Sequence, residues 1–352
     1  MNVEDLAKAL VRVPSITDSP HEAEPLRVIR KELDRYHIIY RLMGASPKQN
    51  LVATIGRGNP VIMLNSHVDV VDAEPKMFLP QIREGKIYGR GAVDAKGPLS
   101  AMIRAFLHFA NEPVNGSIIL CCVCDEENAG KYGSNILAQH HIVGDFQIIG
   151  EPTSLNVVIA QKGFLRLRLR VKGKEAHAAF PKLGDNAIEQ MSAIVHRLTH
   201  VSFGFPHPLL SAQSISFGTI HGGNKINIVA GWCELGVDIR YLPGQKPADV
   251  IKHIRRVAGN VCDIKIADIG QPFETPSSSL LVQSACKITK SPAVGVNYST
   301  DARFFADHDC IVLGPGSPDM AHTSDEYIEL SELRRAEQIY QKLISDLLRP
   351  KR

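Results

Sequence analysis

The sequence predicts an α/β protein: a large domain with a mixed, mainly parallel sheet flanked by helices, plus an inserted α+β domain with an antiparallel sheet. Three observations support this prediction. The chain has 352 residues, more than one hydrophobic core usually supports. Short apolar runs alternate with amphipathic helical patterns in residues 1–163 and 272–352, as in layered α/β domains. Between them, residues 164–171 alternate strictly between apolar residues and arginine, which is typical of a strand with one solvent-exposed face.

Several elements are expected in residues 1–163. Acidic residues open a helix at 3–12, which ends before Pro14, and a second helix is expected at 21–36. Strands are expected at 50–55 and 61–64, separated by a Gly- and Pro-rich turn. Pro98 suits the first position of a helix that continues to Phe109. A strand at 117–123, a helix after Gly133 and a strand at 145–150 complete the alternation.

The pattern changes at residue 164, where the alternating strand begins. Its three arginines could bind an anion, but a solvated sheet face is the favoured interpretation. A helix at 185–199, strands at 214–220 and 226–240, a helix at 247–257 and a strand at 261–266 follow. Gly270 and Pro272 mark the return to α/β structure, with a helix at 278–289, a strand at 310–313 and a helix at 331–348. We therefore predict that residues 164–271 form a domain inserted into a larger one, made of 1–163 and 272–352.

Composition narrows the functional classes. The net charge is only +3, with 44% apolar and 22% charged residues, so neither nucleic acid nor a membrane is expected as a partner. Seven cysteines, an odd number in a long chain, predict a reducing, cytoplasmic setting rather than a disulfide framework. We expect no signal peptide, because the N-terminus resembles an amphipathic helix and lacks a basic start and an apolar core.

Polar side chains with metal-binding chemistry follow the predicted buried strands. His67 and Asp69 come directly after the run at 61–64, and further candidates are Asp94, Glu126, Glu127, Glu151 and His322. Parallel strands collect ligands at their carboxyl ends, and carboxylates gathered there repel one another unless a cation is present. Taken alone, each acid would be an ordinary surface residue. Together they suit zinc or a similar divalent metal, and more than three ligands indicate two ions.

In five motifs the sequence resembles the acetylornithine deacetylase and succinyl-diaminopimelate desuccinylase family of co-catalytic zinc hydrolases. The motifs are Ser66-His67-Val68-Asp69-Val70, Gly89-Arg90-Gly91-Ala92-Val93-Asp94-Ala95-Lys96-Gly97, Asp125-Glu126-Glu127, Gly150-Glu151-Pro152-Thr153 and His322-Thr323. Their order and spacing extend over nearly the whole chain. The resemblance implies two divalent ions, zinc or alternatively cobalt. Asp94 would bridge them, His67 and Glu151 completing one site and Glu127 and His322 the other. It further implies that Asp69 orients His67 and that Glu126 is the general acid/base.

The segment at 173–181 resembles the lid and dimerisation segment of that family. By this resemblance His177 reaches the active site of a partner subunit as an oxyanion donor, in a homodimer. Asn227 and Arg240 match positions that hold the substrate carboxylate, and Arg303 falls in a segment near the pocket. For Arg240, an internal ion pair with Asp238 is the plain alternative. The chain departs from the family pattern at Ala230, where Pro is common, and at Tyr298, where Gly is usual.

These observations predict a two-metal amidohydrolase that removes an acyl group from an N-acyl amino acid in amino-acid biosynthesis. The motifs look closest to acetylornithine and acetyl-lysine deacetylases of arginine or lysine biosynthesis, including hydrolases that free lysine or ornithine from a small amino-group carrier protein. A succinyl-diaminopimelate desuccinylase or a metallo-dipeptidase is the alternative, because those enzymes share every metal ligand. A catalytically silent metal-binding protein of the same fold is the alternative from a different class.

Overall fold

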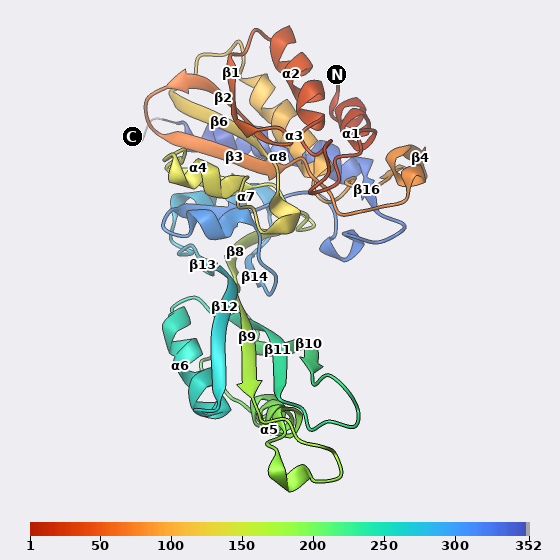
Figure 1. The fold of residues 1–352 in the computed structure, drawn as a ribbon. Helices are drawn as coiled ribbons and strands as arrows, with labels where there is room; N and C mark the ends of the chain where they lie inside the picture. Colours follow the sequence, from red (N-terminus) through yellow and green to blue (C-terminus); the bar gives the residue numbers. More distant parts are fainter. Residues whose placement is uncertain (350–352) are drawn as a thin grey trace. The chain divides into compact units, whose positions relative to one another are not determined.

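The computed structural model describes residues 1–349 and divides into two units (Figure 1). Unit 1 consists of Met1–Ile159, Glu274–Val294 and the chain from Thr300 onward, and unit 2 consists of Ala160–Phe273 and Gly295–Ser299. The short segment at 295–299 belongs to unit 2, which the sequence does not indicate. There the carbonyl of Val296 accepts a hydrogen bond from the backbone of Lys162 at 3.3 Å.

The helices follow the predicted apolar periodicity closely. In unit 1 they are α1 (Val3–Val11), α2 (Pro25–Arg35), α3 (Lys96–His108), α4 (Ser134–Gln139), α7 (Leu280–Thr289) and α8 (Leu330–Leu347). The predicted helix at 21–36 is too long at its start, because α2 begins only at Pro25. Before it, the Glu22 carboxylate accepts the backbone N–H groups of Asp18 and Asp125, which holds residues 18–24 as turns. The predicted start of the next helix at Pro98 is two residues too late, because α3 begins at Lys96. Pro98 still lies in the first turn, where the N–H groups have no partner inside the helix.

A nine-stranded sheet forms the centre of unit 1, in the order β1-β2-β6-β3-β7-β15-β8-β13, with β14 paired to β8. Its strands are β1 (Tyr40–Ala45), β2 (Lys48–Arg57), β3 (Val61–His67), β6 (Gly116–Val123), β7 (Phe146–Ile149), β8 (Val157–Gln161), β13 (Phe273–Glu274), β14 (Ala293–Val296) and β15 (Asp309–Val312). The four central strands β6, β3, β7 and β15 run parallel, while β1 and β2 are antiparallel to their neighbours and β8 is antiparallel to β15. The prediction of a mixed, mainly parallel sheet is confirmed for this core.

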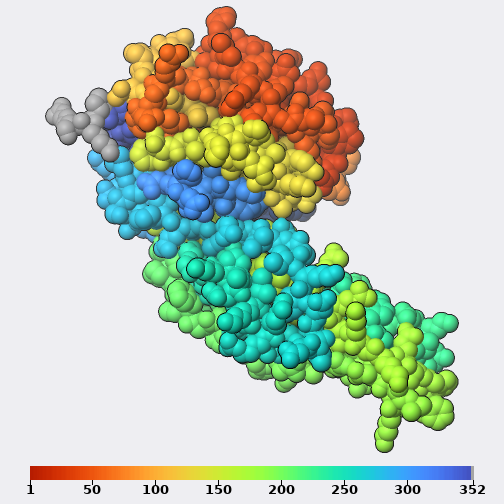
Figure 2. All heavy atoms as spheres, turned by 60° about the vertical axis from the view of Figure 1, so that its left-hand side comes forward, coloured from red at the N-terminus to blue at the C-terminus, as the bar shows by residue number. Residues whose placement is uncertain are grey.

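The parallel core brings distant parts of the chain together. β15 pairs with β7 across more than 160 residues of sequence, and the space-filling view shows C-terminal segments in blue lying directly against yellow segments from residues near 140 (Figure 2). Helix α3 packs on β3 and β6 and contacts α1 and α8. Because parallel strands end at one edge of a sheet, the residues that follow β3, β6 and β7 converge there.

Several short strands have no clear sequence signal. The three-stranded sheet β16-β5-β4 contains β4 (Gln81–Arg83), β5 (Lys86–Tyr88) and β16 (Tyr327–Glu329). The hairpin of β1 and β2 turns at Ser46 and Pro47. Gly44, opposite Gln49 near the end of β1, has a φ of +85°, in the left-handed region that suits glycine. No helix within residues 1–349 is long and apolar enough to cross a membrane.

Unit 2 is a four-stranded antiparallel sheet packed against two helices. Its elements are β9 (Gly163–Lys172), α5 (Ala187–Thr199), β10 (Ser214–Gly222), β11 (Trp232–Tyr241), α6 (Pro247–Ala258) and β12 (Cys262–Gly270). The strand order is β10-β11-β9-β12. The predicted alternation in β9 is confirmed: its apolar residues are buried in the core with α5 and α6, and its arginines are exposed.

The predicted strand at 226–240 is wrong in its first part. β11 begins at Trp232, and the preceding residues instead pair their backbone with the loop after β9. The N–H of Val229 donates to the carbonyl of Ala176 at 2.9 Å, and Asn227 accepts from the N–H of Ala178 at 3.1 Å. Because these hydrogen bonds pair the backbone groups of residues 227–229 outside the four-stranded sheet, the apolar residues before Trp232 do not extend β11.

Candidate metal centre

His67 is the last residue of β3 and is only 1% exposed. Its Nδ1 donates a hydrogen bond to the backbone carbonyl of Asp69 at 2.9 Å. This contact fixes the orientation of the ring, so that Nε2 is the nitrogen available to a metal. Nε2 lies 3.2 Å from Oδ1 of Asp94 and 3.7 Å from Oε2 of Glu151. The ring therefore presents its metal-binding nitrogen to two carboxylates.

Asp94 lies between two histidines. One carboxylate oxygen faces His67, and the other lies 3.3 Å from Nε2 of His322. The same nitrogen of His322 is 3.1 Å from Oε2 of Glu127. Because each oxygen of Asp94 faces a different imidazole, this carboxylate has the geometry needed to bind two ions at once.

Two groups of potential ligands result from this arrangement. Within each group the ligand atoms all lie within 4.8 Å of one another. One group is His67, Glu126 and Glu151, and the other is Asp94, Glu127 and His322. The adjacent residues Glu126 and Glu127, in a short 3-10 helix after β6, thus belong to different groups. All five residues predicted as ligands, and the predicted acid/base Glu126, are brought together in unit 1.

The electrostatics of this cluster favour a cation. Burial and the neighbouring carboxylates of Glu151 and Asp301 raise the pKa of Glu126 well above its ordinary value. Burial raises the pKa of Glu151 to about 7. Hydrogen bonds to Asp94 and Glu127 raise the pKa of His322 to about 10. Protonated groups thus balance the clustered negative charge when no cation is bound, which is the role a divalent ion would take over.

The donor set suits two divalent ions. It contains two imidazoles and four carboxylates, ligand types that zinc accepts, and Asp94 faces both groups. A pair of ions bound in this way would polarise a carbonyl and lower the pKa of a bound water. The residues therefore fit a two-metal hydrolytic centre.

The carboxylate of Asp69 organises the loop opposite His67. It accepts hydrogen bonds from the hydroxyl of Thr17 at 2.9 Å and from the backbone N–H groups of Glu126 and Glu127 at 3.2 Å each. Although burial opposes ionisation, hydrogen bonds from His67 and Thr17 hold the pKa of Asp69 below its ordinary value. The ionised carboxylate can therefore fix the backbone of both glutamates.

Sequence reasoning missed Lys48, which contacts the loop that carries Glu126 and Glu127 through an ion pair with Asp125. Its ammonium lies 2.8 Å from Asp18, 2.8 Å from Glu22 and 2.5 Å from Asp125. Asp125 immediately precedes Glu126 and has a left-handed backbone conformation, with φ of +66°. No local pattern could have identified this contact, because Lys48 and Asp125 are 77 residues apart.

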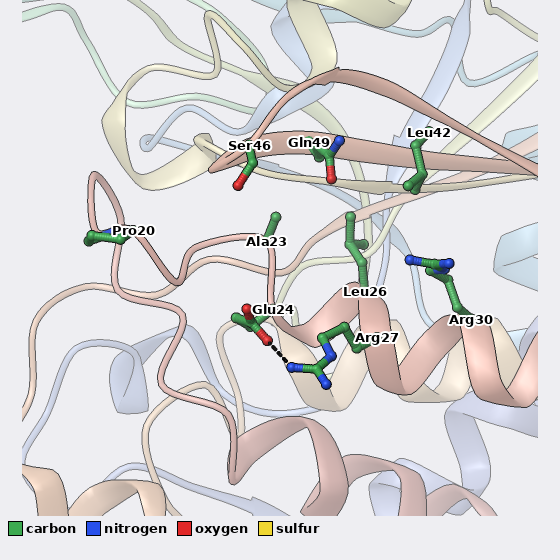
Figure 3. Close-up of a pocket in the computed structure, with 9 residues that line it drawn as sticks. All are labelled: Pro20, Ala23, Glu24, Leu26, Arg27, Arg30, Leu42, Ser46 and Gln49. Atoms are coloured by element: carbon green, nitrogen blue, oxygen red, sulfur yellow. Dashed lines mark hydrogen bonds and ion pairs between the residues drawn. The ribbon is translucent and has the colours of Figure 1, made fainter.

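A shallow hollow of about 150 Å³ lies between α2 and the β1–β2 hairpin (Figure 3). It is bordered by residues adjacent to Glu22 and Lys48, and the ion pair of Glu24 with Arg27 lies at its rim. None of its lining residues belongs to the two ligand groups. The hollow is therefore separate from the candidate metal centre.

The predicted substrate-binding residue Arg303 is buried in unit 1. Its guanidinium lies 3.6 Å from the carboxylate of Asp301, and it donates to the carbonyl of Thr300 at 3.5 Å. Asp301 also accepts a hydrogen bond from the hydroxyl of Ser134 at 2.6 Å. Arg303 therefore takes part in a buried polar network.

The other predicted substrate and lid residues belong to unit 2. His177 is exposed, and its Nδ1 accepts the N–H of Ala179 at 3.0 Å. Asn227 is also exposed. Arg240 forms an ion pair with Asp238 at 2.7 Å, so the internal pair considered from sequence is present. The substrate roles of these residues remain predictions.

Comparisons with known proteins agree with this geometry. Residues 63–346 match peptidase family M20/M25/M40. Over 322 residues the chain is 31% identical to an acetylornithine deacetylase from Photorhabdus laumondii, covering 84% of this chain and 82% of the relative. The fold resembles the aminopeptidase PepT from Bacillus cereus, with a TM-score of 0.83, 19% identity and 99% and 98% of the two chains covered. It also resembles a dinuclear metal-binding M20 peptidase from Bacillus subtilis, with a TM-score of 0.77, 14% identity and 98% and 97% coverage.

Proposed function

Because the chain belongs to peptidase family M20/M25/M40 and is a metal-dependent amidohydrolase, we propose that it removes the acetyl group from Nα of acetylornithine. The observation that carries this proposal is the complete ligand cluster in a chain 31% identical to an acetylornithine deacetylase over most of its length. The peptidases with a similar fold are less than 20% identical and support the architecture alone. A desuccinylase or dipeptidase activity is therefore not favoured.

For the metal centre we propose two zinc ions, with Asp94 as the shared ligand. His67 and Glu151 would complete one site, and Glu127 and His322 the other. The distances of Asp94 to both imidazoles support this assignment. Cobalt is the alternative ion, because the same nitrogen and oxygen ligands accept it.

The bound metals would polarise the amide carbonyl and lower the pKa of the attacking water. Glu126 lies in the first ligand group, and a carboxylate there can accept the proton of that water. It would then deliver the proton to the departing amine. Glu126 is held for this task by the hydrogen bond from its backbone to Asp69. A carboxylate that first accepts and then donates a proton accounts for hydrolysis of an otherwise unreactive amide.

We assign the substrate carboxylate to Asn227 and Arg240, with Arg303 supporting the pocket, and the oxyanion contact to His177. Planar guanidinium groups bind carboxylates through paired hydrogen bonds. Arg240 is partly exposed and already oriented by Asp238, which leaves its remaining donors for a ligand. The same assignment would hold for acetyl-lysine or for an amino acid attached to a small carrier protein.

A homodimer through unit 2 is part of this proposal. Large apolar side chains are exposed on and beside the loop that carries His177, namely Phe180, Leu183, Ile188 and Ile226. Exposed apolar patches of this kind mark protein–protein interfaces. Light scattering coupled to gel filtration should give twice the chain mass, and Ile226→Glu should shift it to that of a monomer. A chain that runs as a monomer at micromolar concentration would contradict the dimer.

The activity itself is tested with a substrate panel. Purified enzyme loaded with zinc would be assayed on acetylornithine, acetyl-lysine, succinyl-diaminopimelate, a set of dipeptides and a carrier-linked lysine. We expect the highest kcat/KM for acetylornithine. A higher value for any other member would replace the proposed substrate, and no turnover of any member would favour the catalytically silent alternative.

A further inference from the structure

Glu326 is a buried acid that the proposed mechanism does not use. It is 1% exposed and immediately precedes β16, four residues after His322. One of its carboxylate oxygens accepts two backbone hydrogen bonds, from the N–H of Val93 at 3.0 Å and from the N–H of Asp94 at 3.2 Å. The turn that carries the shared carboxylate is therefore held by a side chain more than 230 residues away.

Arg90 joins this contact to the segment of the second histidine. Its Nη1 donates to the other carboxylate oxygen of Glu326 at 2.6 Å, and its Nη2 donates to the backbone carbonyl of His322 at 3.4 Å. Arg90 is itself only 5% exposed. One buried ion pair thus contacts the backbone of both Asp94 and His322.

The two ligand groups are supported by different contacts. In the first group, His67 is oriented by the carbonyl of Asp69. Glu151 follows Gly150, whose N–H and carbonyl bond to Asn65 and Ser66. None of these contacts involves Glu326 or Arg90. In the second group, two of the three members depend on that pair. A disturbance of the pair should therefore affect the two groups unequally.

We propose that Glu326 and Arg90 are positioning residues that set the affinity of the second metal site, formed by Asp94, Glu127 and His322. The inference rests on the metal centre proposed above. Glu326 fixes the Asp94 turn through two N–H groups, and Arg90 fixes the His322 segment, so the pair defines the distance between these ligands. Neither residue belongs to the two ligand groups. Outer contacts of this type typically contribute a factor of about 10 to 100 in metal affinity.

The test is metal titration of the full-length chain rather than activity. The wild type, Glu326→Gln and Arg90→Met would be stripped with a chelator and titrated with Zn²⁺ by calorimetry. Co²⁺ absorption would report the ligand geometry. Glu32→Gln is the matched control, because Glu32 is equally buried, pairs with the N-terminal amine at 2.8 Å and has no contact with the cluster among its hydrogen bonds. Circular dichroism would verify that each variant is folded.

The wild type and Glu32→Gln should bind two equivalents. In Glu326→Gln and Arg90→Met the affinity for the second equivalent should weaken by about 10- to 100-fold. The affinity for the first should weaken less, because Asp94 is the only ligand of that site that the pair supports. Wild-type affinity for both equivalents in a folded variant would overturn the inference, and so would equal weakening of both. If Glu326→Gln does not fold, the two metal affinities of Arg90→Met test the same inference. Fewer than two equivalents in the wild type would instead overturn the two-metal centre itself, a failure that the unmodified chain alone reveals.

Discussion

The carboxylate of Asp69 accepts a hydrogen bond from the backbone N–H of Glu126 at 3.2 Å. Its second oxygen accepts the N–H of Glu127 at the same distance, while the backbone carbonyl of Asp69 accepts from His67. The carboxylate of Asp69 thus acts on the glutamate loop, with one oxygen also 3.5 Å from Nδ1 of His67, and its carbonyl orients the histidine. The predicted orienting role of Asp69 accordingly divides between two parts of the residue.

This division predicts a moderate effect for Asp69→Asn. The carbonyl that orients His67 is retained, whereas the amide has only one oxygen left to accept hydrogen bonds from the glutamate loop. We expect kcat/KM and metal affinity to fall about 10- to 100-fold, and His67→Ala to reduce both further because it removes a ligand. Kinetics and metal titration of both variants would show whether Asp69→Asn loses less kcat/KM and metal affinity than His67→Ala. An Asp69→Asn variant as impaired as His67→Ala would contradict it.

Replacing Glu126 by Gln separates proton transfer from metal binding. The amide cannot accept the proton of the attacking water, so kcat should fall by about 10²- to 10⁴-fold. Two metal equivalents should remain, because all five proposed ligands are intact. Elemental analysis and steady-state kinetics measure the two properties, with the exposed pair member Glu24→Gln as control. Full activity of Glu126→Gln would refute the assigned role.

Removal of the metal should abolish hydrolysis and lower thermal stability. The carboxylates around Asp94 would lose the cations that offset their repulsion. At free metal concentrations about 100 times Kd, each site stabilises the fold by about 2.7 kcal/mol. Thermal unfolding before and after chelation, with zinc-saturated chelator as control, measures this difference. Undiminished activity in a chain shown to contain no metal would exclude the metal centre.

Loss of Lys48 should affect both stability and turnover. Lys48→Met leaves the buried Glu22 and Asp125 without their counter-ion, and breaking such a pair costs about 3 kcal/mol. The left-handed turn at Asp125 would loosen, so kcat should fall as well. Denaturant unfolding and kinetics would be compared with Lys8→Met, whose single pair with Asp5 should contribute less than about 1 kcal/mol. Equal stability of the two variants would argue against the Lys48 network.

His177→Ala tests the oxyanion role proposed for unit 2. If the imidazole donates a hydrogen bond to the developing oxyanion, kcat should fall about 10²- to 10³-fold. Metal content should not change, since His177 belongs to neither ligand group. His221→Ala, another exposed histidine of unit 2, is the control. Intact turnover in His177→Ala would remove His177 from the mechanism.

Much of the fold could be read from local patterns. Side chains on a strand point alternately to its two faces. A continuous apolar run, as in β3, β6 and β7, therefore predicts burial on both faces, and the alternation in β9 predicts burial on one. Strands such as β4, β5 and β16 are only three residues long, too short for any periodicity. The start of β11 and of α2 depended on hydrogen bonds to remote loops, which no local pattern contains.

The sequence by itself determined the chemical identity and order of the cluster. Its motifs are recognisable because a metal centre needs particular donor atoms at the ends of buried strands. These motifs contain His67, Asp94, Glu126, Glu127, Glu151 and His322. Only the tertiary structure decided which contacts hold these donors. Lys48 reaches Asp125, and Glu326 reaches Asp94, across 77 and 232 residues. Such pairings follow from chain folding as a whole, because hydrogen bonds and ion pairs depend on distance in space rather than separation in sequence.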